Sequence, residues 1–164
     1  MWSANVSLTW EIIKGLTFRT AATYNTTNNR IDKFYKEGSK EAFRNGQKPY
    51  GDTQMGRDLR WTNSNQLTWK QKINKKNSYD IMLGHEISYR SNEYLLGQAM
   101  DFLVDYLGNN NLGLGATPSK VVTDFGDKKL LSFFARGNYN YDNRYLLTAT
   151  VRADGSTVFS KKNK

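Results

Sequence analysis

This chain contains six stretches in which apolar and polar residues alternate, and the connections between them run short, long, short, long, short. A period of two places successive side chains on opposite faces of a strand, so the pattern predicts β-strands rather than helices. In an up-and-down antiparallel sheet, every short turn then lies at one end and every long loop at the other. The predicted strands cover residues 2–13, 15–25, 58–72, 76–92, 129–142 and 143–154, and the long loops cover 26–57 and 93–128.

The predicted strands are long. Several reach ten or more residues, whereas strands in globular proteins usually have about five or six, and a tilted strand needs roughly 9–11 residues to cross a bilayer. Aromatic residues form two groups, as in the two girdles of a membrane β-barrel. The pattern favours an all-β, antiparallel up-and-down meander. Its short turns lie at one end and its long loops at the other, as in an outer-membrane barrel. The turn-side group is Trp10, Phe18, Trp69, Tyr79, Tyr139, Tyr141 and Tyr145, and the loop-side group is Tyr24, Trp61 and Tyr89.

Three polar residues do not fit the apolar face of this sheet. Asn63, Asn65 and His85 share the parity of their apolar neighbours, and polar groups that face lipid are costly. Two interpretations stay open. A β-bulge near Gly84 could switch the faces, or these positions could lie above the membrane in water.

Composition narrows the classes of function. The formal net charge of +9 makes an anionic surface, lipopolysaccharide or nucleic acid candidate partners, although solvated lysine-rich loops account for the same charge without a partner. The absence of cysteine excludes disulfides and thiolate metal sites, and no run of about 18 apolar residues predicts a transmembrane helix. No secretory signal precedes the first predicted strand, and residues 158–164 look like the start of another. We therefore expect a fragment of a longer protein.

Nothing in the sequence predicts an enzyme, a cofactor or a metal site. His85 is the only histidine, and nothing places a serine beside it for nucleophilic catalysis or enough ligands for zinc. Aspartates of the second long loop and its border lack the spacing of an EF-hand calcium loop. These aspartates are Asp101, Asp105, Asp124 and Asp127.

The last predicted hairpin carries polar candidates for the wall of a barrel lumen. Asp142-Asn143 is a tight turn that can adopt the positive φ angles that hairpins favour. Polar residues of one parity flank this turn, and a structural salt bridge between two of them, or to a group inside the barrel, is favoured over substrate contact. The lumen-wall candidates are Arg136, Asn138, Arg152 and Asp154.

The same hairpin carries a family resemblance. The segment LSFFARGNYNYDNRYLLTATVRADGS, from Leu131 to Ser156, resembles a stretch of the SusC/RagA family of TonB-linked (TonB-dependent) outer-membrane transporters of Bacteroidetes. Segments 11–19 and 79–86 are also similar to that family, so the resemblance covers most of the chain but is weak inside the long loops. Thr157 stands where the family commonly has serine.

The resemblance implies more than the residues themselves show. It implies a segment of an outer-membrane β-barrel of about 22 strands, which in transporters is plugged. It also implies import of oligosaccharides or peptides, driven through TonB, with a SusD-like surface lipoprotein as partner and outer-membrane lipid around the barrel. By this resemblance residues 1–164 form a partial barrel domain in the cell outer membrane. They lack the plug domain and TonB box and are inactive alone.

Two other functions compete with a transporter segment. A soluble β-sheet module could bind glycans through the Asn, Asp and aromatic residues of the long loops, in which we also expect short helical or strand pieces. A single-stranded nucleic-acid binder would stack bases on aromatic side chains interleaved with Lys and Arg. Here the aromatic residues share a face mainly with Leu, Ile, Val and Ala, so we expect no nucleic-acid partner.

Overall fold

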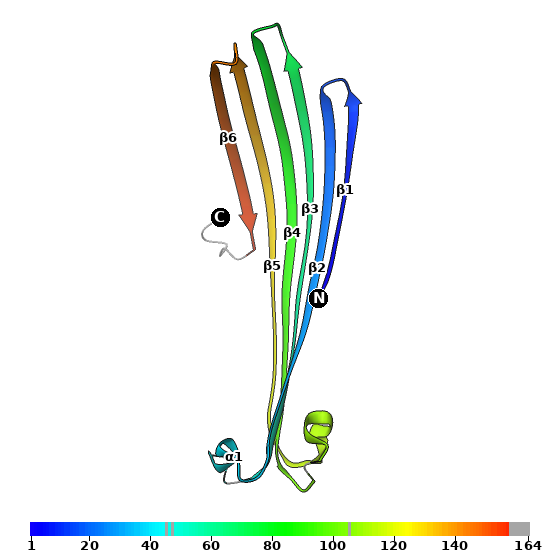
Figure 1. The fold of residues 1–164 in the computed structure, drawn as a ribbon, viewed down its shortest axis with the longest axis vertical. Coiled ribbons are helices and arrows are strands. Elements are labelled where there is room, and N and C mark those ends of the chain that lie inside the picture. Colours follow the sequence, from blue (N-terminus) through cyan, green and yellow to red (C-terminus); the bar gives the residue numbers. More distant parts are fainter. Residues whose placement is uncertain (45, 47, 105, 158–164) are drawn as a thin grey trace. The chain divides into compact units, whose positions relative to one another are not determined.

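The computed structural model describes residues 1–44, 46, 48–104 and 106–157. Six strands form one sheet in the order β1-β2-β3-β4-β5-β6 (Figure 1), which confirms the all-β antiparallel meander. The strands are β1 (Trp2–Ile13), β2 (Leu16–Tyr35), β3 (Tyr50–Lys72), β4 (Asn77–Phe102), β5 (Gly115–Tyr141) and β6 (Tyr145–Ser156). The helices are α1 (Lys40–Arg44) and the 3-10 helix η1 (Gly108–Leu114). Asp105 and the predicted further strand at 158–164 lie outside the described residues.

Two compact units make up the chain. The turn unit consists of Trp2–Thr26, Leu59–Arg90 and Asp127–Lys164. The loop unit consists of Thr27–Asp58 and Ser91–Gly126, together with Met1. Among the described residues, the turn unit holds the three short turns, and the loop unit holds both helices.

The long connections are shorter than predicted. Residues assigned to loops at 26–57 and 93–128 largely belong to strands, and only 36–49 and 103–114 connect them. The physical reason is that strand pairing satisfies backbone hydrogen bonds whatever the side chains are. Where both faces of a strand are polar, as along much of 26–35, the apolar alternation that signals a strand is missing. The short helical pieces expected in these connections are present as α1 and η1.

The three short turns follow the prediction. Lys14-Gly15 joins β1 to β2, residues 73–76 join β3 to β4, and residues 142–144 join β5 to β6, all at one end of the turn unit (Figure 1). Asp142 and Asn143 have φ angles of 54° and 52°. The Asn143 N–H donates to Oδ1 of Asn140 over 3.1 Å. A local side-chain acceptor of this kind stabilises the left-handed backbone that the tight hairpin requires.

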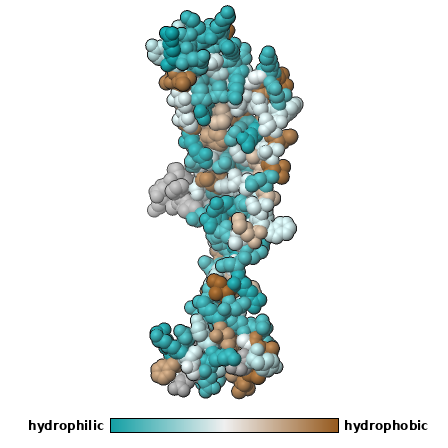
Figure 2. All heavy atoms as spheres, in the orientation of Figure 1, coloured by the Kyte–Doolittle hydropathy of each residue, from teal (hydrophilic) through white to brown (hydrophobic). Residues whose placement is uncertain are grey.

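Strand register gives the turn unit one apolar and one polar face. Across β1 and β2, Trp10 pairs with Phe18 and Thr9 with Arg19. Apolar residues of β1 remain exposed on one face, with Leu8 at 63%, and hydrophobic residues gather along the margin of β1 in Figure 2. In water such a surface would be unfavourable by about 25 cal/mol for each Å² exposed. The apolar face therefore requires lipid or another apolar surface.

The three polar residues of uncertain parity lie on the apolar face. The ring of His85 meets Phe133 edge-on at 6.2 Å. On the same face, Trp61 contacts Tyr89 and Trp69 contacts Tyr79. Asn63 and Asn65 alternate in step with the two tryptophans of β3, and His85 alternates in step with the two tyrosines of β4. The ring contacts on both sides of Gly84 thus keep one parity, so this glycine does not switch the faces of β4. Asn65 Nδ2 donates to Oδ1 of Asn63 over 2.6 Å, which satisfies part of the polar surface.

The loop unit has a small core of its own. Phe34 and Phe102 meet edge-on at 5.2 Å, and Tyr35 stacks on Tyr50 at 5.5 Å. Ala42 of α1 is fully buried. No helix within the described parts of the chain is long and apolar enough to cross a membrane.

Candidate functional site

The four lumen-wall candidates share the polar face of the β5–β6 hairpin. Register pairs Ser132 with Asp154, Phe134 with Arg152, Arg136 with Thr150, and Asn138 with Thr148. Since side chains two apart on a strand lie on the same face, all four candidates point to one side of the sheet. They divide into two clusters, one around Arg152 and one around Asn138. Their lumen-wall role stays a prediction.

Arg152 is held by contacts from three strands. Its Nε lies 2.9 Å from Oδ1 of Asp154, and its Nη2 donates to Ser132 Oγ over 3.0 Å. Nη2 also lies 3.6 Å from Oε1 of Glu86, and the guanidinium covers the Phe134 ring at 5.7 Å. The guanidinium group carries five N–H donors in a rigid plane, so it can bond to several partners at once. The side chain is about half exposed, so we interpret this cluster as a brace across β4, β5 and β6.

Gly84 makes room for this cluster. A side chain at Gly84 would collide with the ring of Phe134, on which the Arg152 guanidinium stacks. The absence of a side chain therefore leaves space for the Phe134 ring at this position of β4. Sequence reasoning considered Gly84 only as a bulge, because its neighbour across the sheet could not be known without the strand register.

A second cluster opens a hollow near the short turns, which we call the turn-end hollow. It has a volume of about 1080 Å³ and is lined by residues of β3, β4, β5 and β6 and of the β1–β2 turn. Asn138 links three of the lining residues: its Oδ1 accepts from Arg136 Nε at 3.2 Å and Thr148 Oγ1 at 2.9 Å, and its Nδ2 donates to Asp80. The Asp80 carboxylate is thus bound through an amide and forms no direct ion pair with Arg136.

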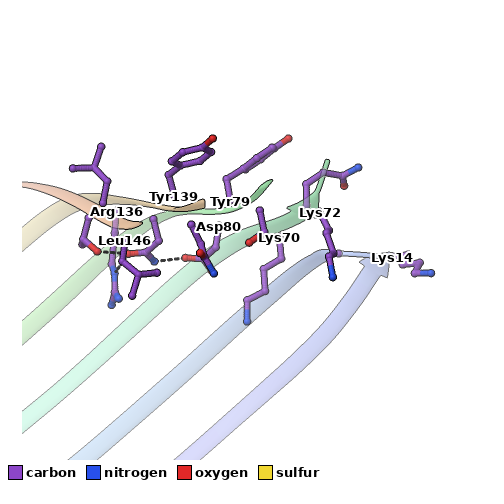
Figure 3. Close-up of a pocket in the computed structure, with 15 residues that line it drawn as sticks. Lys14, Lys70, Lys72, Tyr79, Asp80, Arg136, Tyr139 and Leu146 are labelled. Carbon is purple, nitrogen blue, oxygen red and sulfur yellow. Dashed lines mark hydrogen bonds between the residues drawn. The ribbon is translucent and has the colours of Figure 1, made fainter. Parts of the chain in front are cut away.

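Basic side chains dominate the turn-end hollow. Lys14, Lys70, Lys72 and Arg136 line it, against the single carboxylate of Asp80. Figure 3 shows Lys70, Lys72, Asp80 and Arg136 on one side of the sheet, with Tyr79 and Tyr139 on the other. The even parity of Lys70 and Lys72 is visible in the sequence. Their proximity to Arg136 follows only from the order of the strands, so the sequence did not predict this cluster.

Gly15 fixes the position of the first turn against β3. Its carbonyl oxygen accepts from the Lys70 N–H over 2.7 Å. Gly15 has a φ of 87°, and an added Cβ would collide with the Lys70 carbonyl oxygen. Only glycine meets both demands without strain. This contact places Lys14 beside the lysines of β3.

In the loop unit, a polar network joins the first connection and β3 to β4. Lys48 Nζ lies 2.6 Å from Oδ2 of Asp101, and the Asp101 N–H donates to the Pro49 carbonyl over 2.9 Å. The Tyr50 hydroxyl donates to Oδ2 of Asp52 over 2.9 Å and accepts from Gln98. Burial, followed by the hydrogen bond to Asp52, raises the pKa of the Tyr50 hydroxyl above its usual value of 10.0. Asp101, weighed above as a calcium ligand, is therefore engaged in an ion pair.

Within the described parts of the chain, no group of three or more His, Cys, Asp or Glu side chains could hold a metal ion. The polar clusters around Arg152, Asn138 and Asp101 consist of ion pairs and side-chain hydrogen bonds. The side chains of these clusters can bind and position polar groups.

The sheet has long strands, one apolar and one polar face, and tight turns at one end, which define a segment of an outer-membrane-type β-barrel. No protein-family model matches the chain. It is 28% identical over 99% of its length to TonB-dependent receptor P3 of Formosa agariphila. It is 36% identical over 54% of its length to TonB-dependent receptor SusC of Bacteroides thetaiotaomicron. The chain spans 16% and 8% of these two relatives.

A solved structure has the same fold. The structure titled "Structure of the RagAB peptide transporter" superposes on 98% of the chain with a TM-score of 0.88 and 23% identity, and the match covers 18% of that protein's chain. Together with the relatives above, this makes the chain similar to a segment of a SusC/RagA-type TonB-dependent receptor barrel.

Proposed function

We propose that this segment forms part of the barrel wall of a longer TonB-dependent importer, called the parent receptor below. In this proposal the turn unit spans the outer membrane, with its apolar face toward lipid and its polar face toward the lumen. The loop unit forms part of the extracellular surface. The observation that carries the proposal is the regular separation of the two faces over the paired strands, combined with relatives that are named TonB-dependent receptors.

The proposed cargo is an oligosaccharide or a peptide. Support comes from two sources: one relative is named SusC, and the similar solved structure is titled a peptide transporter. Both are consistent with a SusD-like lipoprotein as partner on the extracellular side and with TonB acting through a part of the parent receptor other than this segment. The role is transport, and the segment contributes wall and loops instead of a reacting group.

A soluble glycan-binding module fits the structure less well. Such a module would bury its apolar residues in a core, yet Val6, Leu8 and Val151 stay exposed at 63–71% on one face of the turn unit. Among the described residues, Phe102 is the only aromatic side chain that is buried, and it lies in the loop unit. A nucleic-acid binder would need aromatic and cationic side chains together on one face, whereas Tyr79 and Tyr139 lie on the opposite side from Lys70 and Lys72 (Figure 3).

Deletion of the parent receptor gene in its host tests the proposal. We expect loss of growth on one class of oligosaccharide or peptide as the sole nutrient, and recovery when the intact gene is returned. A copy that cannot contact TonB serves as the control, and should reach the outer membrane without restoring growth. Recovery of the parent receptor in a soluble fraction, or full growth on every nutrient after deletion, would contradict the proposal.

A further inference from the structure

The turn-end hollow carries more positive charge than a purely structural barrel wall would require. Three lysines and Arg136 line it, with Asp80 as the single acidic group. Across the described residues, Lys14, Lys70 and Lys72 form no ion pair, and Arg136 bonds only through Nε, to Asn138. Like charges held together without counter-charges repel one another. A barrel wall that served only as scaffold would gain stability from carboxylates at some of these positions.

Local structure positions the backbone segments that carry these cations. The Gly15 carbonyl is hydrogen-bonded to the Lys70 N–H, which fixes the turn that carries Lys14. Asn138 binds both Arg136 and Asp80. The Asp80 carboxylate is therefore hydrogen-bonded to an amide instead of being paired with Arg136, and the terminal nitrogens of the guanidinium stay available. These nitrogens can form the paired hydrogen bonds that guanidinium makes with carboxylate or sulfate.

The hollow also offers a mixed surface. Asn140 and Thr148 add polar groups, and Leu146 is 78% exposed at a position that the β5–β6 register places on the polar face. An exposed leucine beside cations suits a ligand that has both an oxyanion and an apolar part. A volume of about 1080 Å³ is ample for one sugar or one to two amino-acid residues of a peptide.

We propose that the turn-end hollow is an oxyanion-binding site, which takes a carboxylate or sulfate group carried by the cargo. Lys70, Lys72 and Arg136 supply the charge, and Lys14 adds to it from the turn. The inference rests on the proposed function for its cargo and goes beyond it by naming the charged group that the lumen wall recognises. Because the hollow is open to solvent, binding should be weak and sensitive to salt.

Binding of two charged probes to the purified parent receptor in detergent tests this site directly. The probes are a fluorescent tetra-aspartate peptide and a fluorescent sulfated disaccharide, each compared with its neutral form, tetra-asparagine or the unsulfated sugar. We expect at least one charged probe to bind and its neutral form not to bind. Raising NaCl from about 50 mM to about 500 mM should abolish binding, since it shortens the screening length roughly three-fold.

Charge-removing variants locate the site. The triple variant Lys70→Gln, Lys72→Gln, Arg136→Gln should weaken binding roughly 10-fold, since each exposed ion pair contributes about 1.4- to 5-fold. The matched control Lys75→Gln, Lys76→Gln, Arg144→Gln removes the same charge from the neighbouring turns, outside the residues that line the hollow. It should change binding less than two-fold.

The outcomes separate this inference from the proposed function. Binding of the charged probes that both triple variants weaken equally would reduce the effect to net charge and overturn the site. Failure of both charged probes to bind the unmodified receptor would also overturn it. If uptake of a neutral cargo continues in that case, the importer role stands and only the oxyanion site falls. Charged-probe binding in a receptor that supports no uptake would preserve the site and reject the importer.

Discussion

Gly15 and Gly84 show how single residues without side chains organise the polar face. The first brings the β1–β2 turn against β3, and the second lets the Phe134 ring lie beneath Arg152. In both places a Cβ would meet backbone or a packed ring, so the sequence has little freedom there. Other glycines of the sheet, such as Gly137, have open space around the position of a Cβ. The difference allows a matched comparison.

Replacing Gly15 by alanine should destabilise the turn unit. The variant must adopt a φ of 87° and move the Lys70 carbonyl, so we expect a loss of more than about 1 kcal/mol in the free energy of unfolding. Urea unfolding of the parent receptor in lipid vesicles measures it. Gly137→Ala is the control and should change stability by less than about 0.5 kcal/mol. Equal effects of the two substitutions would refute this account of the turn.

The hydrogen bonding of Asp32 leads us to expect that the stability of the loop unit falls in acid. Thr53 Oγ1 donates to its carboxylate over 2.8 Å. This bond, opposed by some burial and helped by Arg30, holds the pKa of Asp32 below its usual 3.8. A lowered folded-state pKa means that the unfolded chain binds the proton first as pH falls. The stabilisation is therefore complete above about pH 3.8 and lost as pH falls through the lower, folded-state pKa.

The Asp32→Asn variant should remove this acid sensitivity. We expect hydrogen exchange of residues 27–35 and 50–57, corrected for the intrinsic effect of pH, to speed up below about pH 3.8 in the natural sequence. In the variant the corrected exchange should vary less over the same range. Thr53→Ala should also reduce the acid sensitivity, because it removes the main hydrogen-bond donor to the Asp32 carboxylate. Identical pH profiles in all three proteins would show that Asp32 does not contribute.

Among the elements, the hairpin of β5 and β6 has the most local determinants. Its turn carries two successive residues with positive φ, and Asn143 is bonded to Asn140. Asn143→Val should destabilise the parent receptor by about 1–2 kcal/mol, because a β-branched residue fits the left-handed region poorly. Asn143→Gly should be neutral or stabilising. Urea unfolding in lipid checks both, and a valine variant as stable as the glycine variant would be the contrary result.

Local sequence signals explain which elements could be predicted. The alternation of β1, β4 and β6 and the turn at Asp142-Asn143 mark the turn unit without any knowledge of tertiary contacts. The extension of β2 to Tyr35 and of β4 to Phe102 could not be predicted in this way, because pairing with neighbouring strands holds those residues extended. Helix α1 has a local signal that was missed: Ser39 Oγ accepts from the Ala42 N–H over 3.1 Å, as an N-cap residue does.

The polar clusters were predictable only in part. Parity alone places Arg136, Asn138, Arg152 and Asp154 on one face. Their partners come from other strands: Glu86 reaches Arg152 and Asp80 reaches Asn138 from β4. Such pairs depend on register between strands that are far apart in sequence. The basic side chains of the turn-end hollow come from the β1–β2 turn, β3 and β5, so no single sequence motif predicts the cluster.

As a whole, the chain presents a sheet with two edges, β1 and β6. Edge strands expose unpaired backbone groups and favour association with other chains. In the parent receptor the neighbouring strands of the barrel would pair with these edges and lipid would cover the apolar face. We therefore expect the isolated chain to aggregate in detergent-free buffer, and light scattering after refolding measures this. A stable, monodisperse monomer in such buffer would contradict the expectation.

The central claim is that successive residues of one strand face lipid and lumen in turn. The segment contains no cysteine, so single cysteines carrying spin labels can be placed along β6 once any cysteine elsewhere in the parent receptor is replaced. In lipid vesicles, labels at positions 147, 149 and 151 should contact dissolved oxygen in the bilayer, and labels at 148 and 150 should contact a water-soluble nickel complex. An oxygen accessibility that alternates with a period of two is the predicted result, and equal access of the nickel complex to all five positions would contradict the claim.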